Sequence, residues 1–296
     1  MKKKFNFIDL KYKPKDDLIC LFKISPARGV SMEKAANTVA LESSVGTWTD
    51  VAQSKADYVQ KIRARVFSIK GKLIKVAYPK ELFEPDNVPN ILSSIAGNIL
   101  GMKVVKAIRL EDLSFPKVIL KSFRGPQYGI EGVRKMLKIK SRPLVGTIIK
   151  PKLGLKTKHH AQSAYESWIG GCDIVKDDEN LASQKFNVFE ERIARTLEKA
   201  HKAEEETGEK KAYLVNVTAE TKEMIKRAQI VEDLGGKYIM VDIITAGWAA
   251  LQTLREANFK MAIHAHRAMH AAFDRNPEQG INMMVLADFA RLIGVD

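Results

Sequence analysis

The sequence predicts an α/β protein with two domains: an N-terminal ferredoxin-like α+β domain over residues 1–122 and a series of parallel β/α units over residues 123–296. Three observations support this division. The first ~120 residues follow a β-α-β-β-α-β order, which is that of a ferredoxin-like unit. From residue 144 onward, strand-like and helix-like segments alternate, as in a parallel sheet covered by helices. Between these patterns, residues 121–132 are rich in glycine and proline, which favours a domain junction.

The elements of the first domain are predicted from local pattern. Ser31 suits the N-cap of a helix, because small apolar residues recur at helical spacing after it. Two β-rich runs flank Lys70, Gly71 and Lys72 and predict a hairpin. The resulting order is a strand at 18–24, a helix after 31 that buries Ala35, Ala36, Val39 and Ala40, hairpin strands at 63–69 and 73–78, a helix at 88–96 and a strand at 102–110.

The second domain is predicted to contain five β/α units. The helical patterns between the strands mostly end at glycine, a common C-terminal stop signal. A closed eight-unit barrel needs ~250 residues, more than remain after the junction. The sheet is therefore either open, or the chain stops before a barrel closes. The predicted strands are 145–150, 173–176, 213–217, 238–244 and 259–266.

Composition excludes several classes of protein. A hydrophobic share of 45% argues against general disorder, and no run of ~18 apolar residues predicts a transmembrane helix. Two cysteines, Cys20 and Cys172, cannot form a disulfide framework, so we expect a soluble cytoplasmic protein. The net charge of +14 suits nucleic acid, a membrane surface or an anionic small substrate, and does not by itself distinguish them.

Charged residues gather at the predicted carboxyl ends of the strands, where parallel α/β folds place their sites. Nucleotide-binding glycine loops and the zinc-helix motif are absent from the sequence. The main cluster follows the strand at 173–176, where Lys176, Asp178 and Glu179 end an apolar run. Neighbouring carboxylates supply the oxygen ligands that Mg²⁺ prefers. The alternative interpretation is a solvated acidic loop.

Two further clusters lie at strand ends. Lys150 and Lys152 flank Pro151, and strand alternation would point both amines the same way. Crowding lowers the pKa of a lysine and suits it to act as a base, although two surface lysines would give the same pattern. The third cluster holds His264, His266, Arg267 and His270, in which the arginine suits phosphate binding and the histidines are either functional or structural.

Taken together, these segments resemble the large subunit of ribulose-1,5-bisphosphate carboxylase/oxygenase (RuBisCO). The resemblance covers nearly the whole chain after the basic leader. The segments SPARGV and NILSSIAG at 25–30 and 90–97 are most similar to the archaeal, form III members. The other matching segments are ESSVGTWT at 42–49, GTIIKPKLGL at 146–155, GGCDIVKDDEN at 170–180 and HAHRAMH at 264–270.

The resemblance implies a TIM-barrel catalytic domain and a magnesium site. Lys176 would react with CO2 to form a carbamate, which with Asp178 and Glu179 would hold Mg²⁺. Lys150 would be the base that removes the C3 proton of ribulose 1,5-bisphosphate. The resulting enediolate would attack CO2, and hydration and cleavage would give two 3-phosphoglycerates, with O2 as the competing electrophile.

The resemblance also assigns substrate contacts and an oligomer. Lys152 would orient the substrate, His266 would contact its hydroxyls and assist proton movement, and Arg267 would bind a terminal phosphate. In the family, the remaining contacts come from the neighbouring subunit. A homodimer or a larger assembly of dimers is therefore expected, and no binding to nucleic acid or to a membrane. The residues that would reach the site of the neighbouring subunit are Glu42, Thr47, Trp48 and Asn98.

The sequence departs from the family pattern at its end. It stops at Asp296, after the fifth of eight barrel units. The family's sixth strand, its mobile lysine loop and the segments for the other phosphate have no counterpart here. We therefore expect a C-terminally truncated fragment that folds poorly or aggregates and does not turn over by itself. Substantial carboxylation by the purified chain at saturating Mg²⁺ and bicarbonate would contradict this expectation.

Three other functions compete with the carboxylase. The first is a RuBisCO-like enolase or isomerase acting on a related sugar phosphate, which the retained lysines, carboxylates and His266 disfavour. The second is a nucleic-acid-binding module, which salt-sensitive affinity for random DNA would support. The third is a non-catalytic fragment that depends on a partner chain for solubility.

Overall fold

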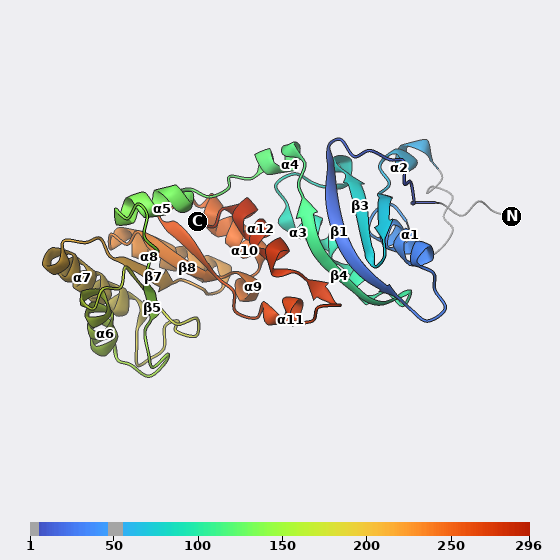
Figure 1. The fold of residues 1–296 in the computed structure, drawn as a ribbon. Coiled ribbons are helices and arrows are strands. Elements are labelled where there is room, and N and C mark those ends of the chain that lie inside the picture. Colours follow the sequence, from blue (N-terminus) through green and yellow to red (C-terminus); the bar gives the residue numbers. More distant parts are fainter. Residues whose placement is uncertain (1–5, 47–55) are drawn as a thin grey trace. The chain divides into compact units, whose positions relative to one another are not determined.

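The computed structural model describes residues 6–46 and 56–296. The chain forms two compact units (Figure 1). The first comprises Met1–Phe123 together with Met269–Phe289, and the second comprises Arg124–Ala268 together with Ala290–Asp296. Thr47 and Trp48, which are expected to reach the site of a neighbouring subunit, lie outside the described residues.

The first unit is built around a sheet in the strand order β10-β4-β1-β3-β2. Strands β1, β2, β3 and β4 pair antiparallel, and β10 adds to the edge of the sheet parallel to β4. The ferredoxin-like order predicted from sequence is confirmed. The elements are β1 (Asp17–Pro26), α1 (Met32–Glu42), α2 (Asp57–Lys61), β2 (Arg65–Lys70), β3 (Leu73–Pro79), α3 (Val88–Ile95), β4 (Val105–Ser114) and α4 (Lys117–Ser122).

Local sequence explains these elements. Alternate residues of β1 are buried, as a strand with one covered face requires: Leu18, Cys20, Phe22 and Ile24. Helix α1 begins where the Ser31 side chain accepts a hydrogen bond from the Lys34 backbone N–H at 3.2 Å. The four small apolar residues predicted for this helix are its buried face: Ala35, Ala36, Val39 and Ala40.

The segment Met269–Phe289 packs with the first unit, although it follows the last strand of the second. It contains α11 (Ala271–Asp274), β10 (Gly280–Ile281) and most of α12 (Met283–Ile293). The buried guanidinium of Arg109 on β4 holds this segment against the sheet, because it donates to the backbone oxygens of Asp274 and Asn276 at 3.0 and 2.7 Å. Sequence analysis had grouped these residues with the barrel units, because hydropathy alone does not reveal this long-range pairing.

Glu278 attaches the same segment to strands β1 and β3. It pairs with Lys23 and with Lys72, at 3.3 Å for the latter, and these contacts lower the pKa of its carboxyl to about 2. Because the folded pKa lies below the ordinary value of 4.5, this stabilisation is present above pH 4.5 and is lost as pH falls towards 2. The difference in unfolding free energy between wild type and Glu278→Gln should therefore shrink across this range in urea titrations. A constant difference would contradict the assignment.

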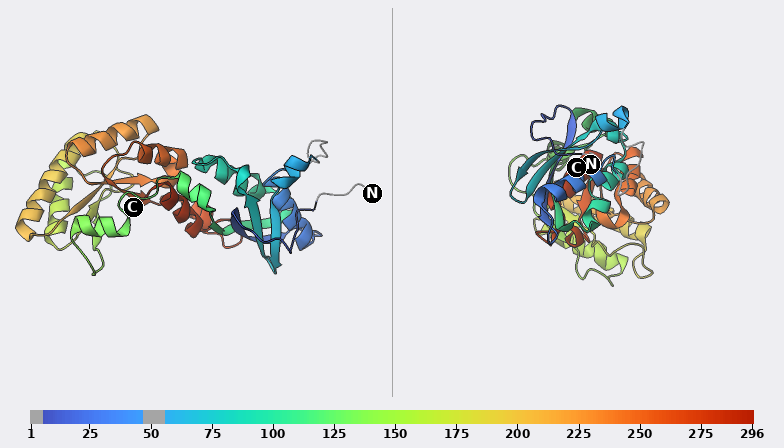
Figure 2. Two further views of the ribbon diagram at one scale, coloured as in Figure 1. Left: turned by 90° about the horizontal axis from the view of Figure 1, so that it is seen from above. Right: turned by 90° about the vertical axis from the view of Figure 1, so that its right-hand side faces the viewer.

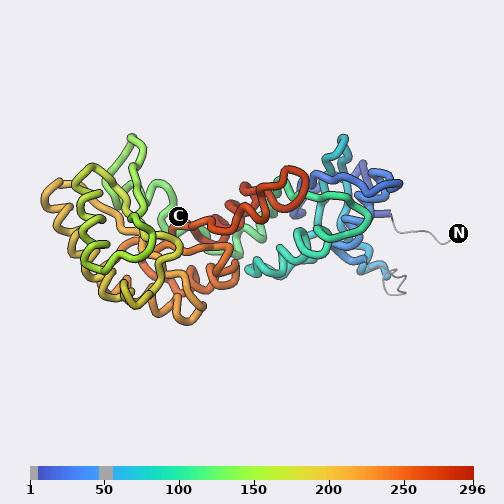
Figure 3. The backbone as a smooth tube through the Cα atoms, turned by 90° about the horizontal axis from the view of Figure 1, so that it is seen from below, coloured from blue at the N-terminus to red at the C-terminus, as the bar shows by residue number. Residues whose placement is uncertain are grey.

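The second unit contains five parallel strands in chain order, β5-β6-β7-β8-β9. The left view of Figure 2 and the tube in Figure 3 show its helices following one another along the sheet as the colour passes from green to orange. All five predicted strands are confirmed. They are β5 (Gly146–Ile148), β6 (Ile174–Lys176), β7 (Ala212–Asn216), β8 (Tyr238–Asp242) and β9 (Ala262–His266).

The helices of this unit end largely where glycine was expected to stop them. Gly208 follows α7 with a φ of 69°, a left-handed conformation that glycine adopts without a Cβ clash. Helix α5 packs against strands β7 and β8, because Leu137 of the helix forms an apolar cluster with Leu214 of β7 and Met240 of β8. The helices are α5 (Gly129–Leu137), α6 (Thr157–Ile169), α7 (Phe189–Thr207), α8 (Thr221–Asp233), α9 (Ile243–Ala246) and α10 (Trp248–Glu256).

Within residues 6–46 and 56–296, no helix combines the length and the apolar character needed to cross a membrane.

Candidate active site

Lys176 lies at the carboxyl end of β6, and its side chain is half-buried. Its Nζ donates to the backbone oxygen of Asp177 at 3.0 Å and approaches Sδ of Met240 at 3.5 Å. Burial lowers the pKa of the amine, while the negative charges of Glu179 and Asp178 oppose that shift. The neutral, nucleophilic form of this lysine is therefore more accessible than that of an exposed lysine.

Asp178 is buried and faces a lysine from the preceding strand-to-helix segment. Lys150 Nζ donates to its Oδ2 at 2.7 Å, and the Asn180 backbone N–H donates to its Oδ1 at 3.1 Å. Burial raises the pKa of this carboxyl, but the bonds from Lys150 and Asn180 outweigh it, so that the net pKa is lowered. Asp178 is thus an anion at neutral pH, with a cation already beside it.

Both predicted lysines reach the loop that follows β6. Lys152 Nζ donates to Asn180 Oδ1 at 2.9 Å, next to the bond between Lys150 and Asp178. The strand predicted to continue to Lys150 ends at Ile148 instead. Pro151 lacks the N–H that a continuing strand needs, which accounts for the early end. The lysines therefore converge through loop geometry rather than through strand alternation.

His266, at the end of β9, lies between two carboxylates. Its Nδ1 is 2.9 Å from Asp242 Oδ1, and its Nε2 is 3.6 Å from Glu179 Oε2. Burial raises the pKa of Asp242, while the nearby His266 opposes this shift. The Ala268 backbone N–H donates to the same Nδ1 at 3.2 Å, so Nδ1 is the accepting nitrogen in this arrangement and Nε2 is the one that faces Glu179. Sequence analysis missed Asp242, which lies inside the strand predicted at 238–244, whereas the observed strand β8 ends at this residue.

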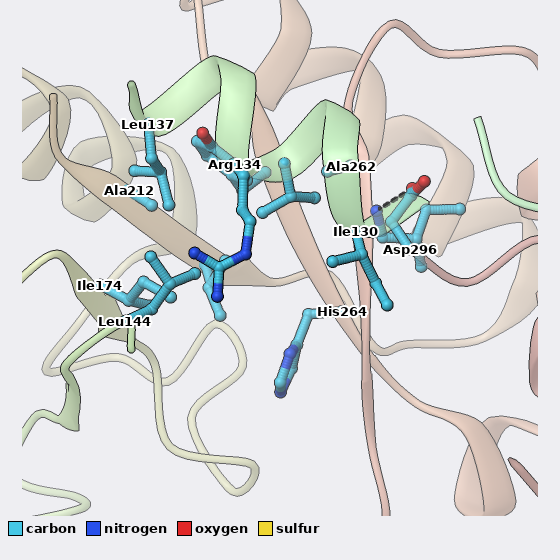
Figure 4. A pocket seen from close by; sticks show the side chains of 13 residues that line it. Ile130, Arg134, Leu137, Leu144, Ile174, Ala212, Ala262, His264 and Asp296 are labelled. Atoms are coloured by element: carbon cyan, nitrogen blue, oxygen red, sulfur yellow. Dashed lines mark hydrogen bonds between the residues drawn. The ribbon is translucent and has the colours of Figure 1, made fainter. Parts of the chain in front are cut away.

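His264 lies outside the cluster of lysines and carboxylates, although it is on the same strand as His266. It lines a cavity of about 270 Å³ between α5 and the inner face of the sheet, shown in Figure 4 with Arg134 and Leu137. Loss of hydration among the surrounding side chains lowers the pKa of His264 to about 4, and the nearby positive charges of Lys176 and His266 lower it further. The lining of this cavity does not include Lys150, Lys176 or Asp178, so the cavity is distinct from the cluster at the strand ends.

The donor set can be tested against the expected Mg²⁺. Among the residues that the structure describes, no three His, Cys, Asp or Glu side chains form a ready-made metal site. Asp178 and Glu179 supply carboxylate oxygens on one loop, and both act electrostatically on the half-buried Lys176 amine. A carbamate at that nitrogen would add the further oxygen ligand that a hard cation needs. The set fits Mg²⁺ once Lys176 is modified.

The remaining predicted residues lie elsewhere. Arg267 is exposed and directly follows β9, and His270 lies at the start of α11 in the first unit. Glu42 ends α1, half-buried, and Asn98 is exposed at the start of a short 3-10 turn. Because these last two belong to the first unit, their part in the site depends on the arrangement of units or subunits.

The fold and the cluster define the class of protein: a parallel β/α barrel-type unit with lysine and carboxylate groups at the carboxyl ends of its strands, joined to a ferredoxin-like domain. Residues 129–296 match the family model for the ribulose bisphosphate carboxylase large chain, catalytic domain, and residues 6–119 match the model for its N-terminal domain. The chain belongs to the RuBisCO large-chain family.

Relatives and solved structures agree with this assignment. The chain is 53% identical to the ribulose bisphosphate carboxylase of Methanocaldococcus jannaschii and 52% identical to that of Methanosarcina mazei. Both alignments cover 98% of this chain, and they cover 70% of the first relative and 69% of the second. A dimeric archaeal Rubisco from Hyperthermus butylicus superposes with a TM-score of 0.93 at 49% identity, covering 98% of this chain and 69% of that one. An octameric Rubisco from Pyrococcus horikoshii gives 0.94 at 46% identity, with 98% and 70% covered.

Proposed function

We propose that this chain carries the site for carboxylation of ribulose 1,5-bisphosphate, which yields two 3-phosphoglycerates. The observation that carries the proposal is a cluster at the carboxyl ends of the strands. Lys150 contacts Asp178 at 2.7 Å, His266 lies 3.6 Å from Glu179, and both carboxylates act electrostatically on Lys176. Membership of the RuBisCO family supports the reaction class. The identities of the substrate and the metal are part of the proposal.

Lys176 prepares the site by reacting with CO2. Its lowered pKa makes the neutral amine accessible, so a nitrogen–carbon bond forms, one C=O π bond opens to a carboxylate, and the amine proton leaves to solvent. The carbamate, Asp178 and Glu179 would then hold Mg²⁺. When bound, Mg²⁺ supplies a Lewis acid that polarises oxygens of the substrate.

The other residues handle protons and phosphate. Lys150, once released from Asp178, takes the C3 proton of the sugar bisphosphate and so produces the enediolate. Lys152 orients the substrate, and His266, whose Nδ1 lies 2.9 Å from Asp242 Oδ1, donates and accepts protons through Nε2. Arg267 binds a terminal phosphate. Attack of the enediolate on O2 is the side reaction that this proposal includes.

The proposed assembly is a homodimer or a set of dimers. The Hyperthermus butylicus neighbour is dimeric and the Pyrococcus horikoshii neighbour is octameric, which supports association of this chain. In such a dimer, Glu42, Thr47, Trp48 and Asn98 would reach the site of the partner subunit. Ribulose 1,5-bisphosphate, CO2 and O2 would be its small-molecule partners.

The test is incorporation of labelled bicarbonate. Because this chain by itself is expected not to turn over, the protein tested is a chain that extends this sequence through all eight barrel units. It is incubated with Mg²⁺, ¹⁴C-bicarbonate and ribulose 1,5-bisphosphate, and acid-stable label in 3-phosphoglycerate is measured. We expect label in wild type and in the exposed-surface control Lys158→Ala. Loss of the C3 proton to solvent without labelled product would instead support an enolase or isomerase. Neither labelled product nor proton exchange would overturn the proposed function.

A further inference from the structure

Asp177 is a fully buried carboxylate between Lys176 and Asp178 that the proposed reaction does not use. Tyr213 donates its hydroxyl proton to Asp177 Oδ1 at 2.6 Å, and His160 Nε2 lies 3.1 Å from the same oxygen. The Asn216 backbone N–H donates to Oδ2 at 3.1 Å, and Arg192 Nε lies 3.4 Å from it. Every one of these partners comes from outside the loop that carries Asp177.

These partners come from three elements of the second unit. His160 belongs to α6, Arg192 to α7, and both Tyr213 and Asn216 to β7. Arg192 is itself fully buried, and a buried guanidinium needs a counter-charge to offset its lost hydration. The Asp177 carboxylate is therefore held on the side of the helices, and Lys176 Nζ meets the backbone oxygen of Asp177 instead.

A second anchor holds the residues that follow. The Asn216 side-chain amide donates to the backbone oxygens of Glu179 and Leu181, each at 3.1 Å, and to that of Asp178 at 3.4 Å. The Asp177 backbone N–H also donates to the backbone oxygen of Leu214 at 3.1 Å. The loop after β6 is thus held to β7 at several successive residues through the side chains of Asp177, Tyr213 and Asn216.

We propose that Asp177 is a positioning residue: its anchored carboxylate turns the backbone after β6 so that Lys176 remains available to CO2 and the Asp178 and Glu179 oxygens face the metal position. It is not itself a ligand, because both of its oxygens are engaged by buried donors. Asn216 keeps the same loop in register with β7. The link to Lys176 rests on the proposed function, whereas the anchoring of the loop does not.

The experiment compares three variants. Asp177→Asn removes the charge, and Tyr213→Phe removes one donor while leaving the ion pair with Arg192, so that it serves if Asp177→Asn does not fold. Asp173→Asn is the matched control, because Asp173 is equally buried, accepts from an arginine at 2.7 Å, and lies at the opposite end of the same strand. Urea unfolding of each variant corrects for differences in global stability.

The first readout is amide hydrogen exchange over residues 177–181. We expect exchange about tenfold faster in Asp177→Asn or Tyr213→Phe than in Asp173→Asn, because local opening loses an anchor only in the first two. The second readout is the yield of Lys176 carbamate by ¹³C NMR after incubation with ¹³C-bicarbonate and Mg²⁺. We expect the yield to fall severalfold in the same two variants and to hold in Asp173→Asn.

The two readouts separate the possible failures. Equal exchange in all three variants would overturn the positioning role, whatever happens to CO2. Faster exchange with an unchanged carbamate yield would overturn the link between the loop and Lys176. If wild type itself forms no carbamate, the proposed function is wrong at its first step, and hydrogen exchange alone still decides whether Asp177 anchors the loop.

Discussion

In a chain that extends through all eight barrel units, replacing Lys176 with alanine is expected to abolish CO2-dependent activation, which is measured here as CO2-dependent binding of Mg²⁺. The alanine has no amine to form a carbamate, so the site would keep only the carboxylates of Asp178 and Glu179. Loss of supporting groups around a metal ligand typically weakens affinity 10–100-fold, and loss of a direct ligand should cost at least about 100-fold. Mn²⁺ binding followed by electron paramagnetic resonance, with and without bicarbonate, measures this directly.

Charge must be separated from carbamate formation in this experiment. Lys176→Arg keeps a cation at the end of β6 but cannot form the carbamate, so it should lose the effect of bicarbonate as fully as the alanine variant does. Lys158→Ala, on the exposed side of α6, should behave as wild type. Bicarbonate-dependent metal binding that survives in Lys176→Ala would remove Lys176 from the metal site.

In a chain that extends through all eight barrel units, replacing Lys150 with alanine is expected to stop proton exchange at C3 of the substrate while leaving metal binding largely intact. Removing a general base usually slows its step by about 10²–10⁴-fold. The structure adds a second effect, because Lys150 Nζ now bonds to Asp178 Oδ2 at 2.7 Å. Without this partner, Asp178 Oδ2 is released to the cation while Oδ1 keeps its bond from the Asn180 backbone N–H, so the affinity for Mg²⁺ should be unchanged or slightly tighter.

The measurement is deuterium uptake at C3 of ribulose 1,5-bisphosphate by mass spectrometry, run beside Mn²⁺ binding on the same preparation. A slow exchange with normal metal binding supports Lys150 as the base. Exchange at the wild-type rate would assign proton removal to another group, with His266 the next candidate. Loss of metal binding would mean instead that Lys150 maintains the geometry of Asp178.

The sequence was sufficient to predict the five parallel strands and the ferredoxin-like order. Apolar runs bounded by glycine, and the alternation in β1, are local properties that survive without knowledge of neighbours. The charged residues at strand ends were also readable, because parallel strands bring their carboxyl ends to one edge. The roles assigned to Lys150, Lys176 and Asp178 came from the family resemblance and remain predictions.

The sequence did not reveal which side chains engage one another. Asp242 was overlooked, although it approaches His266 at 2.9 Å, because the residues are far apart in the chain. The sequence did not single out Asp177, yet the structure anchors it to Arg192 and Tyr213, whereas Asp178 bonds to Lys150. Strand alternation sets Asp178 apart from Asp177, but it does not reveal the partners of either, since both lie where the strand has already ended.

The sequence by itself determined the class of fold, the family and the position of the charged loops, because these depend on hydropathy period, glycine stops and ordered motifs. The tertiary structure decided that Met269–Phe289 packs with the first unit and that Asp177 faces the helices. Both outcomes depend on buried arginines, Arg109 and Arg192, each of which needs acceptors from distant parts of the chain. A buried charge selects its partners only when the fold brings them together.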